Sequence, residues 1–132
     1  MSTIHSRGAG HYLQTQVQSR SPLELVVMLY DGAIQQADAA REALLANNIP
    51  ARKVAISKML AIISQLQNTL DMERGGEIAE NLDRIYSWAT ARLLDAVVTR
   101  DTKPVDEVRR VLDGLRDAWQ TIAANQLTGS QP

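Results

Sequence analysis

Residues 21–32 read SPLELVVMLYDG, and this stretch decides the fold because it joins a helix start to an excess of apolar surface. Ser21 can accept hydrogen bonds from the free backbone N–H groups of a helix, Pro22 suits the first helical position, and Glu24 completes a capping box. The remaining positions up to Tyr30 are all apolar. One helix face cannot use so many apolar side chains, so the surplus indicates a second contact surface.

Three further segments carry apolar residues at helical spacing, and they are separated by the breaks at 47–50, 75–76 and 101–104. The apolar positions are Ile56, Met59, Ile63, Leu66 and Leu70; then Ile78, Leu82, Ile85, Ala89, Leu93 and Ala96; then Val105, Val108, Leu112, Leu115, Trp119 and Ile122. The second helix is expected to continue from Pro50 to the glycine pair. Short connections make successive helices antiparallel, so the sequence predicts an all-α fold, an antiparallel up-down four-helix bundle.

The two ends of the chain differ in composition from the predicted bundle. Residues 1–20 are rich in Gly, Ser, Thr and Gln and hold too little apolar surface to fold alone. We therefore expect a mobile N-terminal arm at 1–20, a helical bundle at 21–124 and a frayed tail at 125–132.

Composition argues against several classes of function. The 14 basic and 15 acidic residues nearly cancel, so no basic stripe for nucleic acid or acidic lipid is expected. The absence of cysteine excludes disulfides, zinc–thiolate sites and thiol catalysis, and it fits a reducing compartment. No apolar run approaches the length of a membrane span or of a signal-peptide core. We expect a soluble, cytoplasmic protein that does not insert into membranes.

No set of residues suggests catalysis or a bound cofactor. The two histidines, His5 and His11, both lie in the arm, which argues against a phosphotransfer bundle and a di-iron bundle. Gly75 and Gly76 lack the Lys-Ser/Thr that a phosphate-binding loop requires. The carboxylates at the start of the third helix are more simply attributed to the helix dipole than to acid–base chemistry. We expect neither an enzyme nor a cofactor.

Three of the four predicted helices carry a second stripe of apolar or small residues behind the core stripe. The stripes comprise Leu25, Met28, Gly32, Ala39 and Ala43; then Val54, Ser57, Ala61, Ser64 and Asn68; then Ser87, Ala91, Leu94 and Val98, with Trp88 close by. Together they could form a shallow groove that receives another helix, because small residues permit close approach. The stripes could equally pack on each other in a homodimer, or be no more than the scattered apolar residues that are normal on protein surfaces.

Several blocks of the sequence occur together in an order that is typical of one family. The blocks are HYLQTQV, SPLELVVMLYDGAI, LDMERGGEIAENLDRIYSWATARLLDA and EVRRVLDGLRDAWQTI. In this set the chain resembles the FliS family of flagellar export chaperones over nearly its whole length. The resemblance implies a cytoplasmic, non-enzymatic bundle that binds the disordered C-terminal segment of flagellin. It also implies that the chaperone prevents premature polymerisation and delivers flagellin to the flagellar type III export apparatus.

Candidate residues for the binding groove come from both lines of reasoning. Helix periodicity suggests Leu25, Met28, Val54, Ala61, Leu94 and Val98. The resemblance adds Tyr30 and Tyr86 as core or groove-edge positions, and it suggests that Tyr12, Leu13 and Val17 of the arm cover part of the empty groove. The alternative for Tyr12 is simple packing against the first helix. The alternative for the whole protein is a homodimeric interaction bundle without a client.

Overall fold

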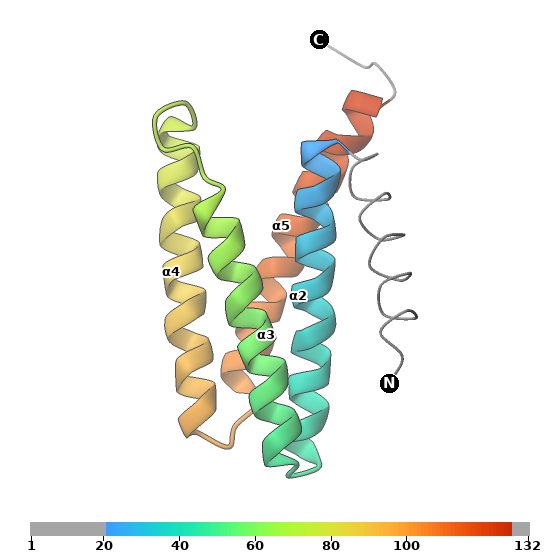
Figure 1. Ribbon diagram of the computed structural model, residues 1–132, viewed down its shortest axis with the longest axis vertical. Coiled ribbons are helices and arrows are strands. Elements are labelled where there is room, and N and C mark those ends of the chain that lie inside the picture. Colours follow the sequence, from blue (N-terminus) through green and yellow to red (C-terminus); the bar gives the residue numbers. More distant parts are fainter. Residues whose placement is uncertain (1–20, 128–132) are drawn as a thin grey trace, which may run out of the picture.

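The computed structural model describes residues 21–127, and within this range the chain forms four α-helices and no strand (Figure 1). The helices are α2 (Pro22–Leu45), α3 (Ile49–Asn68), α4 (Gly76–Val98) and α5 (Lys103–Leu127). Successive helices run in opposite directions, as the ribbon shows. The predicted all-α, up-down four-helix architecture is confirmed.

The helices form a ring in which each one packs against its two neighbours. Helix α3 lies between α2 and α4, and α5 closes the ring by packing against both α2 and α4. The largest fully buried side chains are Tyr30, Tyr86, Ile56, Met59, Ile63, Leu66, Leu93, Leu112, Val105 and Val108. These positions follow the helical spacing of the sequence, so one core runs along the bundle.

The start of α2 has the capping box that its sequence predicts, and the start of α3 has a side-chain cap as well. The Glu24 backbone N–H donates to Ser21 Oγ at 3.2 Å, and the Ser21 backbone N–H donates to Glu24 Oε1 at 3.3 Å. At α3, the Ala51 backbone N–H donates to the side-chain oxygen of Asn48 at 3.2 Å. Such caps satisfy backbone donors that have no partner within the helix.

Helix α3 ends earlier than the sequence suggests, at Asn68 instead of the glycine pair. The Asp71 carboxylate accepts hydrogen bonds from the backbone N–H groups of Glu73 and Arg74, which forms a local turn that competes with the helix. The turn closes tightly at Gly75, where an added Cβ would lie 2.7 Å from the Asp71 carbonyl oxygen. The connection between α3 and α4 is therefore a built turn and not a frayed helix end.

Alanines fill the core side of the second half of α2. Ala33, Ala37 and Ala40 are fully buried and Ala43 is 6% exposed, whereas Leu45 is 66% exposed. The assignment of Ala43 to an outward stripe is therefore wrong. Ala43 is buried because its side chain is a single methyl group, which lets the neighbouring helices pack closely against α2.

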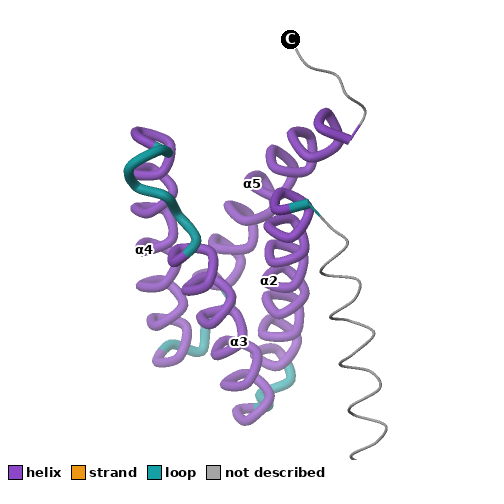
Figure 2. The backbone as a smooth tube through the Cα atoms, turned by 45° about the horizontal axis from the view of Figure 1, so that its top comes forward, coloured by secondary structure: helices purple, strands orange, loops and turns teal. Residues whose placement is uncertain are grey.

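The last helix continues to Leu127, beyond the boundary at residue 124 that the sequence suggests. Figure 2 shows the upper half of α5 leaning away from α4, so the ring is open at the end where α2 begins. None of the four helices in the described range combines the length and the apolar character that a membrane span requires.

Candidate protein-binding surface

The open end of the bundle holds an apolar cavity of about 250 Å³. Side chains from the first turns of α2 and α4 and from the last turn of α3 line it, and Trp119 of α5 closes one side. The apolar members of the lining are Pro22, Leu23, Val26, Leu66, Leu70, Ile78, Ala79, Leu82, Tyr86 and Trp119. A cavity of this kind can accept apolar side chains from another segment.

Sequence reasoning placed most of these lining residues in the core and missed the cavity; Tyr86 was the one groove candidate among them. Leu23, Leu70 and Ile78 have the right helical spacing for a core, but each lies near the end of its helix at the open end of the bundle. Ile78 is 70% exposed as a result. Leu23, Leu70 and Ile78 all lie next to predicted loops, and this shared position was the one feature of the sequence that indicated a cavity.

Tyr30 and Tyr86 lie beneath this cavity and are core residues. Their side chains are 0% and 2% exposed, and their hydroxyl oxygens lie 2.5 Å apart in a hydrogen bond. Burial raises the pKa of Tyr30, and hydrogen bonds to Tyr86 and Trp119 partly oppose that rise. Burial also raises the pKa of Tyr86, and the adjacent Tyr30 hydroxyl raises it further.

Tyr30 and Tyr86 are therefore core residues, one of the two positions that the resemblance suggested, and contact of either residue with a client stays a prediction. Both residues lie on the inward faces of their helices, where each hydroxyl group has the other as its hydrogen-bond partner. Tyr86 still contributes apolar surface to the cavity at the open end. Trp119 is half-buried and packs against the core, as its spacing suggests.

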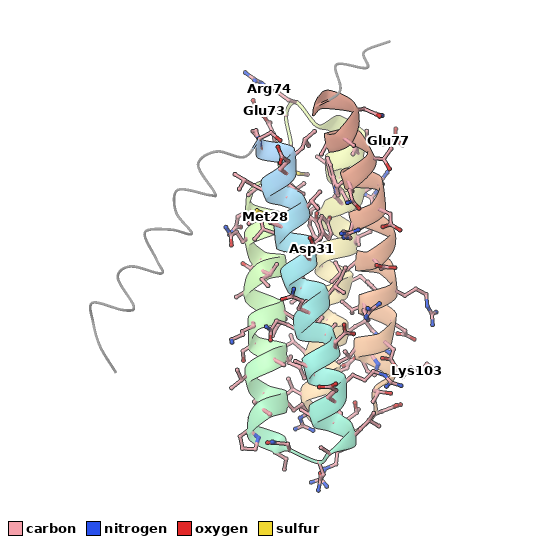
Figure 3. All side chains as sticks on the ribbon, turned by 90° about the vertical axis from the view of Figure 1, so that its right-hand side faces the viewer. Met28, Asp31, Glu73, Arg74, Glu77 and Lys103 are labelled. Carbon is pink, nitrogen blue, oxygen red and sulfur yellow. The ribbon has the colours of Figure 1, made fainter. Side chains whose placement is uncertain are left out.

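Leu25 and Met28 lie on the outer side of α2. With Leu29 and Gln65 they line a hollow of about 300 Å³ between α2 and α3. Gly32, two turns along from Leu25, also faces α3, since an added Cβ would lie 3.4 Å from the Ile62 side chain. Met28 is 38% exposed and is labelled in Figure 3, so part of this stripe is accessible to a partner.

The candidates on α3 and α4 are the most exposed members of the set. Val54 is 54% exposed, Leu94 is 53% exposed and Val98 is 84% exposed. Ala61 is exposed as well. These residues form no enclosed pocket, and they lie on the outward sides of two adjacent helices.

Ion pairs cover a different face of the bundle, where α5 meets α2. The Arg41–Asp106, Arg109–Asp38 and Arg116–Asp31 pairs join the two helices at 3.1, 2.7 and 2.5 Å. Asp31 is labelled in Figure 3 on the side of α2 toward α5. The outer face of α3 carries only Lys53 and Lys58 as charged residues. Met28 lies at the border of the two kinds of surface, because it also lines a hollow of about 310 Å³ with Asp31 and Arg116.

The arm residues Tyr12, Leu13 and Val17 lie outside the described residues. The chain enters the bundle at Ser21, and the next residues, Pro22 and Leu23, line the cavity at the open end. Both histidines of the chain also precede residue 21. Within residues 21–127 no group of three or more His, Asp or Glu side chains could hold a metal ion.

Comparison with known proteins assigns the chain to a family. The family model described as "Flagellar protein FliS" matches residues 5–126. The chain belongs to this family. Flagellar secretion chaperone FliSB of Pseudomonas aeruginosa, a FliS-family relative, is 37% identical over 111 residues, which cover 84% of this chain and 88% of the relative.

Further relatives agree with the FliS assignment. Flagellar secretion chaperone FliS of Salmonella typhimurium is 38% identical over 112 residues, which cover 84% of this chain and 83% of the relative. A crystal structure described as a flagellar chaperone from bacteria has the same fold, with a TM-score of 0.74 at 20% identity. The match covers 92% of this chain and 98% of that one. The chain is thus a member of the FliS family, whose relatives in Pseudomonas aeruginosa and Salmonella typhimurium are named flagellar secretion chaperones.

Proposed function

We propose that this FliS-family protein acts in the cytoplasm and binds the disordered C-terminal segment of newly made flagellin. In this role it keeps flagellin from polymerising prematurely and delivers it to the flagellar type III export apparatus. The observation that carries the proposal is the exposed apolar surface of α2, α3 and α4, represented by Met28, Val54, Leu94 and Val98. Family membership supports the flagellar context.

The chemistry of this surface suits a segment that folds on binding. A disordered client loses conformational entropy when it becomes ordered, so its binding needs wide apolar contact. Leucine, valine and methionine side chains each contribute about 1.5–3 kcal/mol when they are fully buried. An amphipathic segment that lies across α2, α3 and α4 would bury its own apolar face and these residues together.

We propose a covering role for the N-terminal arm in the absence of flagellin. Tyr12 lies about ten residues before Pro22, so an extended chain lets it reach up to about 35 Å from the bundle end. Pro22 and Leu23, which follow the arm in the sequence, line the cavity at the open end, and this supports a short path from the arm into that cavity. Tyr12, Leu13 and Val17 are the apolar residues that would enter it.

Titration calorimetry of the full chain with the C-terminal segment of its own flagellin tests the proposal. The expected result is one-to-one binding with a negative heat-capacity change, because apolar surface is buried. We propose that the flagellin segment also fills the cavity at the open end, so a chain that starts at Ser21 should bind it more tightly, because the arm no longer occupies that cavity. Absence of binding by both forms would reject flagellin as the client.

A homodimer without a client is the alternative use of the same exposed residues. Light scattering across a range of concentrations distinguishes the two. A dimer that persists in the presence of excess flagellin segment would favour the alternative, whereas a monomer that gains the mass of one segment would favour the chaperone role.

A further inference from the structure

A small cavity lies at the closed end of the bundle, where the loop between α2 and α3 and the loop between α4 and α5 are found (Figure 1). It has a volume of about 10 Å³, which is room for one group of about the size of a water molecule. The polar residues that line it are Asn47, Asn48, Arg52 and Arg100. The lining thus contains two cations and no carboxylate.

Arg52 is the buried cation of this cavity. Its side chain is 8% exposed, and one of its terminal nitrogens donates to the Val97 carbonyl oxygen at 3.2 Å. Its Nε–H has no hydrogen-bond partner among the described residues. Buried donors are nearly always paired, because an unpaired donor has lost its hydrogen bonds to water without a replacement. The free Nε–H therefore indicates that a ligand or a bound water molecule completes the site.

Two further donors without an acceptor belong to the lining. The Ile49 backbone N–H, in the first turn of α3, has no acceptor within residues 21–127, and that turn carries no acidic side chain. Arg100 is exposed and forms no ion pair in the same range. The N-terminus of a helix carries a partial positive charge, so it favours an anion, as the two guanidinium groups do.

The size of the cavity and the arrangement of its donors favour a carboxylate over other anions. One carboxylate oxygen has about the size of a water molecule and can accept a hydrogen bond from Arg52 Nε inside the cavity. The second oxygen then stays at the mouth, where the exposed Arg100 can donate to it. Charge-assisted hydrogen bonds of this kind are about twice as strong as neutral ones. A phosphate group would leave three oxygen atoms outside the cavity with one cation to receive them, so it fits less well.

We propose that this cavity binds one carboxylate group, and that the flagellin segment supplies it when it lies on the exposed apolar surface of α2, α3 and α4. The source of the carboxylate rests on the proposed function. Val54 follows Arg52 by two residues on α3, and Val98 precedes Arg100 by two residues, so the cavity adjoins that surface. The group is the C-terminal carboxylate of the segment or the side chain of one of its acidic residues.

NMR spectroscopy of the arginine Nε–H groups in the full chain tests the cavity without flagellin. The signal that is missing in the Arg52→Met variant identifies Arg52. Sodium acetate should shift this signal saturably. Acetamide has nearly the same shape without the charge, so it should leave the signal nearly unchanged at the same concentrations. Sodium chloride at equal ionic strength corrects for screening.

Two variants define the role of the second cation. Arg100→Gln should weaken acetate binding about twofold to fivefold, as expected for the loss of one exposed ion pair. Lys53→Gln is the matched control, because Lys53 is an exposed cation next to Arg52 in the sequence and does not belong to the lining. This control variant should bind acetate as the wild type does.

Titration calorimetry with the C-terminal segment of flagellin tests the source of the carboxylate. Arg52→Met should weaken the binding of the segment about tenfold with unchanged helicity, because a buried charge-assisted hydrogen bond is lost. An amidated C-terminus that weakens wild-type binding to the same extent would identify the terminal carboxylate. Unchanged binding of the amidated segment by the wild type would identify an acidic side chain instead. Both results support the proposal and distinguish its two sources.

Three results would overturn the proposal. Equal effects of acetate and acetamide on the Arg52 signal would show that the cavity holds a neutral molecule such as water. Tighter binding of inorganic phosphate than of acetate would make it a site for phosphate groups. Unchanged flagellin affinity in the Arg52→Met variant would exclude flagellin as the source of the carboxylate. Absence of flagellin binding by the wild type would reject the proposed function, and the acetate titration distinguishes that failure from a failure of the cavity to bind a carboxylate.

Discussion

The hydroxyl oxygens of Tyr30 and Tyr86 lie 2.5 Å apart and join α2 to α4, which occupy opposite corners of the helical ring. Both side chains are buried, directly below the cavity at the open end of the bundle. The pair thus fixes the separation of two helices at the level where the cavity above them begins to widen. It supports the cavity without being part of an outer binding surface.

Removal of one hydroxyl group from this pair should destabilise the bundle. Tyr86→Phe removes the hydroxyl group that pairs with the buried Tyr30 hydroxyl, so we expect a loss of about 1–2 kcal/mol in the free energy of unfolding. The double variant Tyr30→Phe with Tyr86→Phe should lose less free energy of unfolding than the sum of the two single variants. The reason is that it leaves no buried hydroxyl group without its hydrogen-bond partner. Urea denaturation measures all three; strict additivity would contradict a coupled pair.

The same pair predicts a loss of stability in alkaline solution. The folded protein raises the pKa of both tyrosines above the ordinary value of about 10, so the unfolded chain releases these protons first. Their contribution is complete below about pH 10 and is lost as the pH rises further. Urea midpoints between about pH 8.5 and about pH 11 should fall more steeply for the wild type than for the double phenylalanine variant. Equal slopes would contradict the expectation.

Arg52 is a buried cation near the closed end of the bundle. Its side chain is 8% exposed, and one of its terminal nitrogens donates to the Val97 carbonyl oxygen at 3.2 Å, in the last turn of α4. The Nε atom has no partner among the described residues. A cation at a helix C-terminus interacts favourably with the helix dipole, and its stem fills apolar space.

Two substitutions of Arg52 distinguish the contribution of its packing to stability from that of its charge. Arg52→Met keeps an unbranched stem and removes a buried charge, so we expect a change within about 1 kcal/mol. Arg52→Ala leaves a cavity and should cost about 2–3 kcal/mol. Thermal and urea unfolding compare the two variants. Equal destabilisation by both would show that the charge at the end of α4 matters more than the packing.

Helix positions were predictable from the sequence because caps and spacing act locally. Ser21 with Glu24 indicated the start of α2, and the break at 47–50 indicated where α3 starts. The end of α3 was less predictable, because the Asp71 turn competes with a helical pattern that continues through Leu70. Local side-chain hydrogen bonds of this kind are not visible in apolar periodicity.

The candidate surface was predictable only in part. Val54, Leu94 and Val98 are exposed, as the second stripes suggested, since a helix wheel separates inward from outward positions well. The cavity at the open end was missed because its lining has core spacing, and only the divergence of the helix ends leaves it uncovered. That divergence depends on tertiary packing, which periodicity does not describe.

Leu94→Glu should weaken flagellin binding and leave the fold intact. Leu94 is 53% exposed, so a carboxylate there stays hydrated in the free protein but would lose water beneath an apolar client. We expect at least a tenfold loss of affinity, about 1.4 kcal/mol, by titration calorimetry. Helicity by circular dichroism should not change; its loss would show that Leu94 supports the core.

Lys103→Glu provides the control for this substitution. It also introduces a carboxylate at an exposed position, but on α5, which contributes no residue to the exposed apolar surface of α2, α3 and α4; Figure 3 shows Lys103 on the other side of α2 from Met28. The negative charge is favourable at a helix N-terminus, so the fold should tolerate it. Flagellin affinity should remain that of the wild type. An equal loss in both variants would point to long-range charge repulsion and not to contact at Leu94.

Methyl NMR spectroscopy of the full chain, with and without the C-terminal segment of flagellin, would show which residues contact the client. We expect intermolecular contacts and large shift changes at the methyl groups of Met28, Val54, Leu94 and Val98. The buried methyl groups of Leu112 and Val108 should change little, because the core is already packed. Absence of binding, or unchanged methyl signals of Val54, Leu94 and Val98 on binding, would show that flagellin does not use the exposed apolar surface of α2, α3 and α4.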